Sequence, residues 1–187
     1  MRGSFVFYIL LLIQCANAQG IDCKKISNLS NKEIKKIFPF SKTNEIRLVS
    51  FKGTLNLKGD SIAHLPQKDG RVNLSQLFES KTLKSKDEDF VLDLLVNYGY
   101  DPSLTEIGEE VAMCYSPRNA ILFLDKEKNV IGYIEICYEC KRYEIGPESI
   151  KISALCSYKF RLTKELFKKV GITYGVSKVD WWESPKN

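Results

Sequence analysis

The spacing of apolar residues predicts one long helix and two short ones. Residues 85–98 carry apolar side chains at i, i+1, i+4, i+5 and i+8, which places them on one helical face, and Gly99 follows. Ser30 and Ser85 each precede a glutamate by three residues, and both pairs are predicted to form capping boxes at helix starts. A third, short helix is expected over residues 163–170, capped by its first residue, a threonine.

Apolar runs rich in β-branched and aromatic residues predict an antiparallel sheet. The predicted strands cover residues 45–57, 119–125, 130–140, 149–162 and 172–179. The alternation is cleanest in 149–162, where every even-numbered residue is apolar. Residues 60–72 contain Pro66 and the pair Asp69-Gly70, which predicts a loop. The combined pattern favours the α+β class, an antiparallel sheet with two or three helices packed on it.

The first 18 residues are predicted to be a secretory signal peptide. An apolar stretch at 5–13, too short to span a bilayer as a helix, precedes the small-x-small cleavage pattern of residues 16–18. Cys15 lies in a lipoprotein-like box, but a glutamine precedes it where a small residue is usual, so plain cleavage is favoured over lipid anchoring. Residues 19–187 are expected to form a single exported domain, periplasmic or extracellular, without a transmembrane span.

Charge and motif content narrow the class of function. The net charge is +5, and the lysines are interspersed with acidic residues rather than gathered in a patch. Together with the lack of a nucleic-acid-binding motif, this predicts a solvated mixed surface and no nucleic-acid partner. The motifs of serine hydrolases, zinc proteases and P-loop proteins are missing from the sequence, so no catalytic residue and no cofactor is predicted. The expected partner is an unidentified protein or small molecule.

The cysteines carry the main candidate chemistry. An exported chain meets an oxidising compartment, where disulfides are the default state of paired cysteines. If residues 125–129 form a hairpin turn and the residues flanking it pair, Cys140 lies opposite Cys114, within reach of a disulfide. Cys114–Cys140 is therefore the first choice of pair. Cys114–Cys137 is the alternative if the register slips.

Two more cysteines complete the set that remains after signal cleavage. Cys23 lies near the mature N-terminus and could tie that end to the sheet through Cys137. Cys156 falls on the apolar side of its predicted strand and is expected to be a buried, unpaired thiol. Five cysteines are an odd number, so at least one is unpaired or pairs between molecules.

Two alternatives to a structural disulfide remain open. Cys137 and Cys140 form a C-x-x-C motif, but a redox motif of this kind sits at a helix N-terminus, whereas a strand is predicted here. Cys114, Cys137 and Cys140 could bind a metal with His64, the only histidine, although a second close pair of ligands is missing. No metal ligand is therefore predicted, and His64 is expected to be a solvent-facing loop residue. A thiol-disulfide oxidoreductase and a Cys-ligated metal-binding protein remain the alternative functions.

The hairpin sequence resembles a group of uncharacterised exported bacterial proteins. The resemblance rests on Cys114-Tyr115-Ser116-Pro117-Arg118, two apolar strands, and Cys137-Tyr138-Glu139-Cys140 at the end of the second strand. In that pattern a histidine often follows the arginine, whereas this chain has Asn119, which weakens a metal-binding or acid–base role. The resemblance covers residues 114–140 and implies no activity.

Three further residues are weaker binding candidates. Arg118 enters a strand beside the cysteines, where it could hold an anion, but an internal ion pair with Glu135 or Glu139 is favoured. Trp181 and Trp182 form an aromatic pair that could contact a partner or a sugar, although core packing is favoured. The leading hypothesis is an exported, disulfide-stabilised, non-enzymatic binding protein of unknown ligand.

Overall fold

The computed structural model describes residues 23–52, 64–68, 71–101, 103 and 115–176. Its helices and strands in chain order are β1 (Lys24–Lys25), α1 (Asn31–Ile34), β2 (Glu45–Phe51), β3 (Gln67–Lys68), β4 (Arg71–Val72), the 3-10 turn η1 (Leu74–Gln76), β5 (Leu77–Thr82), α2 (Ser85–Asn97), β6 (Tyr98–Gly99), β7 (Asn119–Leu124), β8 (Val130–Cys137), β9 (Arg142–Gly146) and α3 (Ser157–Lys169). The predicted signal peptide, Cys114, Trp181 and Trp182 lie outside the described residues.

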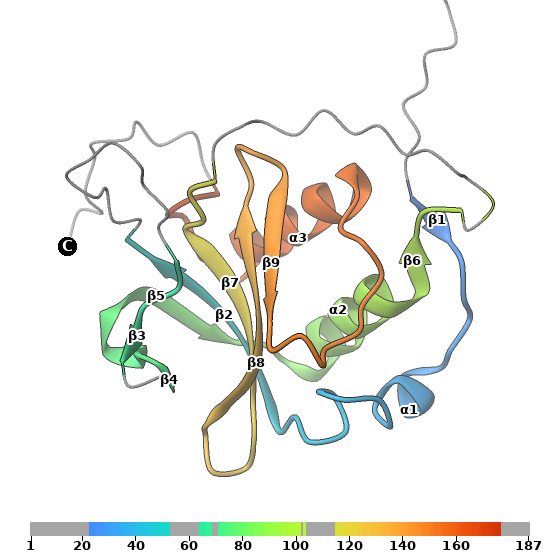
Figure 1. Ribbon diagram of the computed structural model, residues 1–187, viewed down its shortest axis with the longest axis horizontal. Coiled ribbons are helices and arrows are strands. Elements are labelled where there is room, and N and C mark those ends of the chain that lie inside the picture. Colours follow the sequence, from blue (N-terminus) through green and yellow to red (C-terminus); the bar gives the residue numbers. More distant parts are fainter. Residues whose placement is uncertain (1–22, 53–63, 69–70, 102, 104–114, 177–187) are drawn as a thin grey trace, which may run out of the picture.

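A five-stranded antiparallel sheet organises the fold (Figure 1). Its strand order is β5-β2-β7-β8-β9, and the short pairs β1–β6 and β3–β4 lie outside it. The sheet and the three helices confirm the predicted α+β class. None of the helices in the described ranges is long and apolar enough to cross a bilayer.

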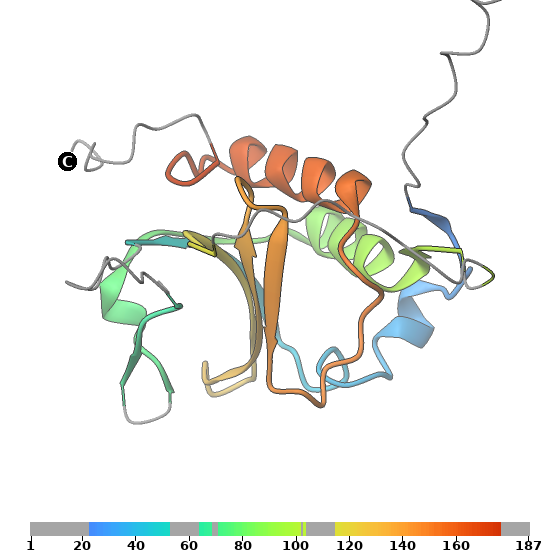
Figure 2. The same cartoon turned by 45° about the horizontal axis from the view of Figure 1, so that its top comes forward.

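The sheet is covered on both faces, as Figure 2 shows: α2 and α3 lie against one face, and the β3–β4 hairpin lies on the other side. Central strand β7 is buried along its whole length. Its Ile121 and Phe123 belong to the main core with the helices, whereas Leu122 and Leu124 belong to a second, smaller core on the opposite face. A strand buried on both faces has a continuous apolar sequence, which is why this one was predicted correctly.

One predicted capping box is present and the other is wrong. The Ser30 side chain accepts from the backbone N–H of Glu33, whose carboxylate accepts in turn from the Ser30 backbone N–H. Helix α2 exists as predicted, but its N-cap is Lys84, which makes no side-chain cap bond. Ser85 is already the first helical residue, so its backbone does not have the extended conformation that a capping residue needs.

The strand predicted over 149–162 is wrong along its whole length, since residue 149 lies in a turn and residue 150 has no regular structure. Residues 151–156 have no regular structure, and α3 runs from Ser157 to Lys169. The predicted cap Thr163 lies inside this helix, where its hydroxyl donates to the Lys159 carbonyl at 2.7 Å. Gly171 follows the helix with φ +88°, so its role as the end of the helix is confirmed.

Two edge strands were missed, and two predicted segments differ. Strands β5 and β9 lie at opposite edges of the sheet, where half-exposed polar residues weaken the alternating pattern. The predicted loop over 60–72 contains the β3–β4 pair. In the predicted last strand, 172–176 forms turns, and the remaining residues lie outside the described part.

The β7–β8 hairpin has a bulge next to its turn. Leu124 pairs with Val130 as predicted, but Phe123 then pairs with Gly132 rather than with Ile131. The extra residue on β8 shifts every later pair by one position, so the register from which Cys114 was aligned with Cys140 is wrong. The disulfide between them stays a prediction.

Candidate functional site

Strands β8 and β9 present two glutamates side by side on the face opposite the helices. In β8, Ile134 and Ile136 pack into the main core, so Glu135 between them points to the other face. Glu135 pairs directly with Glu144 of β9. Directly paired residues of an antiparallel sheet share a face, which places the two carboxylates next to each other.

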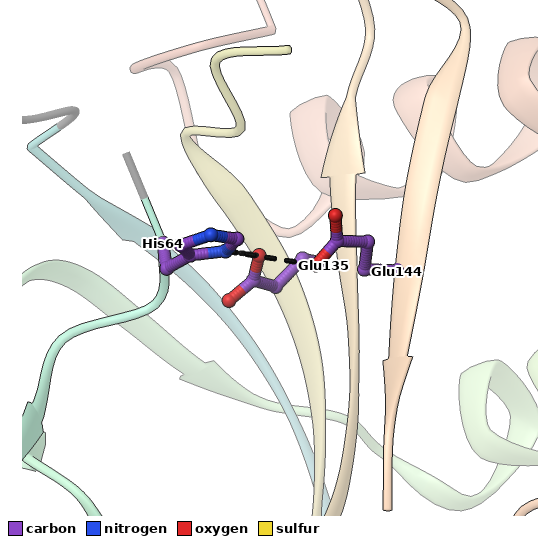
Figure 3. Close-up of side chains that lie close together, drawn as sticks. All are labelled: His64, Glu135 and Glu144. Atoms are coloured by element: carbon purple, nitrogen blue, oxygen red, sulfur yellow. Dashed lines mark hydrogen bonds and ion pairs between the residues drawn. The ribbon is translucent and has the colours of Figure 1, made fainter. Parts of the chain in front are cut away.

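His64 lies over this pair of carboxylates (Figure 3). Its Nδ1 atom is 3.2 Å from Glu135 Oε2 and 3.6 Å from Glu144 Oε2. The three side chains differ in exposure: Glu135 is 1% exposed, whereas His64 and Glu144 are about half exposed, at 47% and 49%. The group therefore has one buried carboxylate, and its other two side chains are accessible to solvent. His64 is a solvent-facing loop residue as predicted, but it is not a bystander, because the buried carboxylate of Glu135 provides a partner for its ring.

Glu135 is held by further contacts. The Leu65 backbone N–H donates to Glu135 Oε1 at 2.6 Å, and the Tyr115 hydroxyl donates to Oε2 at 3.3 Å. Burial raises the pKa of Glu135 above its ordinary value, while the bonds from Leu65 and His64 oppose that shift. Burial and the charge of Glu135 also raise the pKa of Tyr115, so this tyrosine stays protonated and acts as a donor. A buried carboxyl with a raised pKa is a common feature of functional sites.

A pocket of about 770 Å³ opens beside the group. Its lining includes Lys52, Gln67, Gln76 and Tyr133 as well as His64 and Glu144. This volume falls within the range of about 300–1,000 Å³ typical of small-molecule sites. Most of the lining side chains carry polar groups, so the pocket suits a small polar ligand.

The C-x-x-C cysteines are buried and are not among the residues that line this pocket. Cys137 ends β8, Cys140 lies in the turn before β9, and both pack with Tyr115 at 2% exposure. The Cys140 N–H donates to Cys137 Sγ at 3.3 Å. Strand β9 follows the motif, so the helix N-terminus that lowers a redox thiol's pKa does not occur here.

The disulfide seen in the described part joins Cys23 to Cys156. Their Cα atoms are 5.8 Å apart, and 133 positions separate them in the sequence. The expectation that Cys156 is unpaired is therefore wrong, although the residue is fully buried as predicted. The proposed link from Cys23 to Cys137 is also wrong. The disulfide ties the chain's N-terminal part to the start of α3 rather than to the sheet.

Arg118 forms the internal ion pair that the sequence favoured. Its Nη1 lies 3.0 Å from Glu139 Oε1, and its side chain is 10% exposed. Of the two predicted partners, Glu139 is the one that it contacts. Asn119, which stands where the resembling proteins often have histidine, donates its side-chain amide to the Tyr174 carbonyl at 2.9 Å.

The site formed by His64, Glu135 and Glu144 was missed at the sequence level. A signal was present at Glu135, a charged residue between two isoleucines in a predicted strand. It could not be interpreted without β9, which carries the neighbouring carboxylate. No protein-family model matches the chain, and comparisons with curated proteins and with solved structures found no match.

Proposed function

We propose that this chain is an exported, disulfide-stabilised binding protein that takes a small amine or amino acid into the pocket over β8 and β9. The observation that carries the proposal is the buried carboxylate of Glu135, flanked by Glu144 and His64 at the edge of that pocket. A carboxylate in an apolar surrounding is costly unless a positive group accompanies it. A ligand ammonium group would supply such a charge.

The rest of the lining fits a ligand of this class. Gln67 and Gln76 offer amide groups as donors and acceptors, and the Tyr133 ring adds an aromatic wall. Lys52 adds a positive charge to the pocket lining, opposite in sign to the glutamates, so it suits the carboxylate of a zwitterionic ligand. The two opposite charges of an amino acid would therefore both find a partner.

Binding is favoured over thiol chemistry for two reasons. Cys137 and Cys140 are buried beside Tyr115, where a substrate disulfide has no access to them. The Cys23–Cys156 disulfide supports an oxidising compartment, in agreement with export.

Calorimetric titration of the metal-free protein in EDTA with putrescine, arginine and choline tests the proposal. Arginine carries both a positive and a negative charge, so it should make the most contacts of the three ligands. Arginine binding should be lost in Gln76→Lys, because this substitution places a second cation in the pocket. Ser75→Lys is the matched control, because it adds the same charge at the neighbouring position outside the described pocket lining. Absence of heat with all three probes, or unchanged binding by Gln76→Lys, would overturn the proposal.

A further inference from the structure

We infer that His64, Glu135 and Glu144 form a binding site for a divalent first-row metal ion of the zinc class. The inference rests on the proposed function because it uses the same pocket. It adds a metal ion as a second ligand, next to Glu135. Among the described residues, these three form the group whose imidazole and carboxylate atoms converge closely enough to bind one ion, all within 4.8 Å of one another.

The spacing of the donor atoms matches shared coordination. Zinc–nitrogen and zinc–oxygen bonds of about 2.0–2.2 Å place two ligand atoms about 3.0 Å apart at a right angle and about 3.4 Å apart at the tetrahedral angle. His64 Nδ1 lies 3.2 Å from one glutamate oxygen and 3.6 Å from the other. One ion can therefore contact all three side chains after small rotations about their terminal bonds.

The chemistry of the donors selects the type of ion. Imidazole nitrogen suits zinc and its first-row neighbours, whereas calcium and magnesium prefer sites made wholly of oxygen. Two carboxylates with a neutral imidazole carry a charge of −2, which a divalent cation neutralises. The ion also removes the repulsion between two adjacent carboxylates, Glu135 and Glu144, that directly pair across the strands.

Neighbouring groups already fix the buried ligand. The Leu65 N–H and the Tyr115 hydroxyl both donate to Glu135, one to each oxygen, as outer contacts do in metal sites. Tyr115 is itself covered by Arg142, whose guanidinium carbon lies 5.2 Å from the ring centroid. Three protein ligands leave a coordination position toward the pocket, the arrangement of zinc sites that exchange a water or ligand.

His64 is the only histidine of the chain, which permits a direct test. The exported protein is purified without a histidine tag, with its disulfides intact, and titrated with zinc chloride. We expect native mass spectrometry to show one bound zinc, and the ¹⁵N spectrum of the single imidazole to show metal bound at Nδ1. The half-exposed Glu144 and His64 permit the variants Glu144→Gln and His64→Gln, each expected to weaken zinc affinity by at least about tenfold.

Two controls make the outcomes decisive. Glu165→Gln removes an exposed carboxylate on α3 and should leave zinc affinity unchanged. Cys137→Ala should also bind zinc normally, which excludes a thiolate ligand. Absence of zinc binding, or equal affinity in Glu144→Gln, would overturn the inference, while arginine binding in EDTA would still support the proposed function. Conversely, zinc binding by wild-type protein that gives no heat with any of the three amines in EDTA would overturn the proposed function alone.

Discussion

Replacing Cys156 with alanine should destabilise the protein about as much as replacing Cys23, and the double replacement should be little worse than either. The structure joins these residues in one disulfide, so the first substitution already breaks the bond and the second has no bond left to break. This outcome differs from that of an unpaired buried cysteine, whose loss would add to the effects of the other substitutions.

The length of the closed loop sets the magnitude. With 133 positions between the two cysteines, the chain-entropy model gives a stabilisation of about 5 kcal/mol at 25 °C. Measured values are usually about 2–4 kcal/mol, because unfolded chains retain structure that already shortens the loop. Total stabilities of domains are about 5–15 kcal/mol, so the bond accounts for a substantial share.

Urea unfolding followed by circular dichroism measures the free energy of unfolding for wild type, both single variants and the double variant. Breaking the cross-link should also raise the m-value, since the unfolded chain then exposes more surface. Cys137→Ala provides the matched control: its thiol is buried in a separate cluster and is not part of the disulfide. Its effect should add to that of Cys23→Ala.

Additive losses for Cys23→Ala and Cys156→Ala would refute this reasoning. So would a loss below about 1 kcal/mol in both single variants, since that is less than the lower range for native disulfides. A peptide map of the non-reduced protein identifies the bond directly, and a Cys23 peptide linked to any partner other than Cys156 would contradict the structure.

Three other predictions concern charge and the second cysteine pair. Burial opposes ionisation of Glu45, but hydrogen bonds from Lys128 and two neighbouring side chains outweigh this effect and lower the pKa of Glu45 to about 2. The stability of the folded protein should therefore fall as the pH drops from about 5 to 2. In Glu45→Gln, the plot of melting temperature against pH should be flatter over this range. Burial lowers the pKa of Lys159 to about 7, so the unfolded chain holds more protons than the folded chain above that pH. Urea titrations should therefore show that wild type gains stability relative to Lys159→Met between pH 7 and 10. Parallel pH profiles of the two proteins would contradict this. Cys114→Ala and Cys140→Ala are each expected to lower stability by about 3 kcal/mol without additivity, and additive losses would show that these two cysteines are not paired.

Elements with one consistent local signal were predictable from the sequence. Strand β7 is apolar from Ala120 to Leu124, in line with its burial on both faces, and helix α2 has an apolar side with charged residues on the other. Helix α3 has two competing signals. Its apolar residues follow a helical period, but the alternation that begins at Ile150 continues through its first turns and favoured a strand. Its buried positions also include Lys159 and Thr163, which a sequence pattern assigns to the surface.

The structure shows why a lysine can occupy that buried position. Lys159 Nζ donates to the Leu95 carbonyl at 3.1 Å and to the Ser153 carbonyl at 2.9 Å. Leu95 belongs to the last turns of α2, where carbonyl groups lack helical partners and favour a cation. The contact that stabilises the buried ammonium group thus depends on α2 and α3 being packed together, which no local pattern can report.

The disulfide and the candidate site depend in the same way on distant segments. The hairpin geometry could suggest partners only within residues 114–140, whereas Cys23 and Cys156 meet through the docking of α3. Glu144 could not be placed beside Glu135 without β9, an edge strand of five residues with a weak pattern. Each missed feature joins parts of the chain that are remote in sequence.

Leu65 explains how the site comes together. Its side chain is 1% exposed and packs in the second core with Val49 and Leu122, on the sheet face opposite the helices. Its backbone N–H donates to Glu135, so the burial of one leucine both fixes the carboxylate and brings the preceding residue, His64, over it. The second core has fewer buried side chains than the main core, and it holds the segment that carries the only nitrogen donor of the candidate site. Packing on this face therefore positions His64 and Glu135 relative to each other. The free-energy cost of burying Glu135 is offset by the hydrogen bonds that the same packing creates.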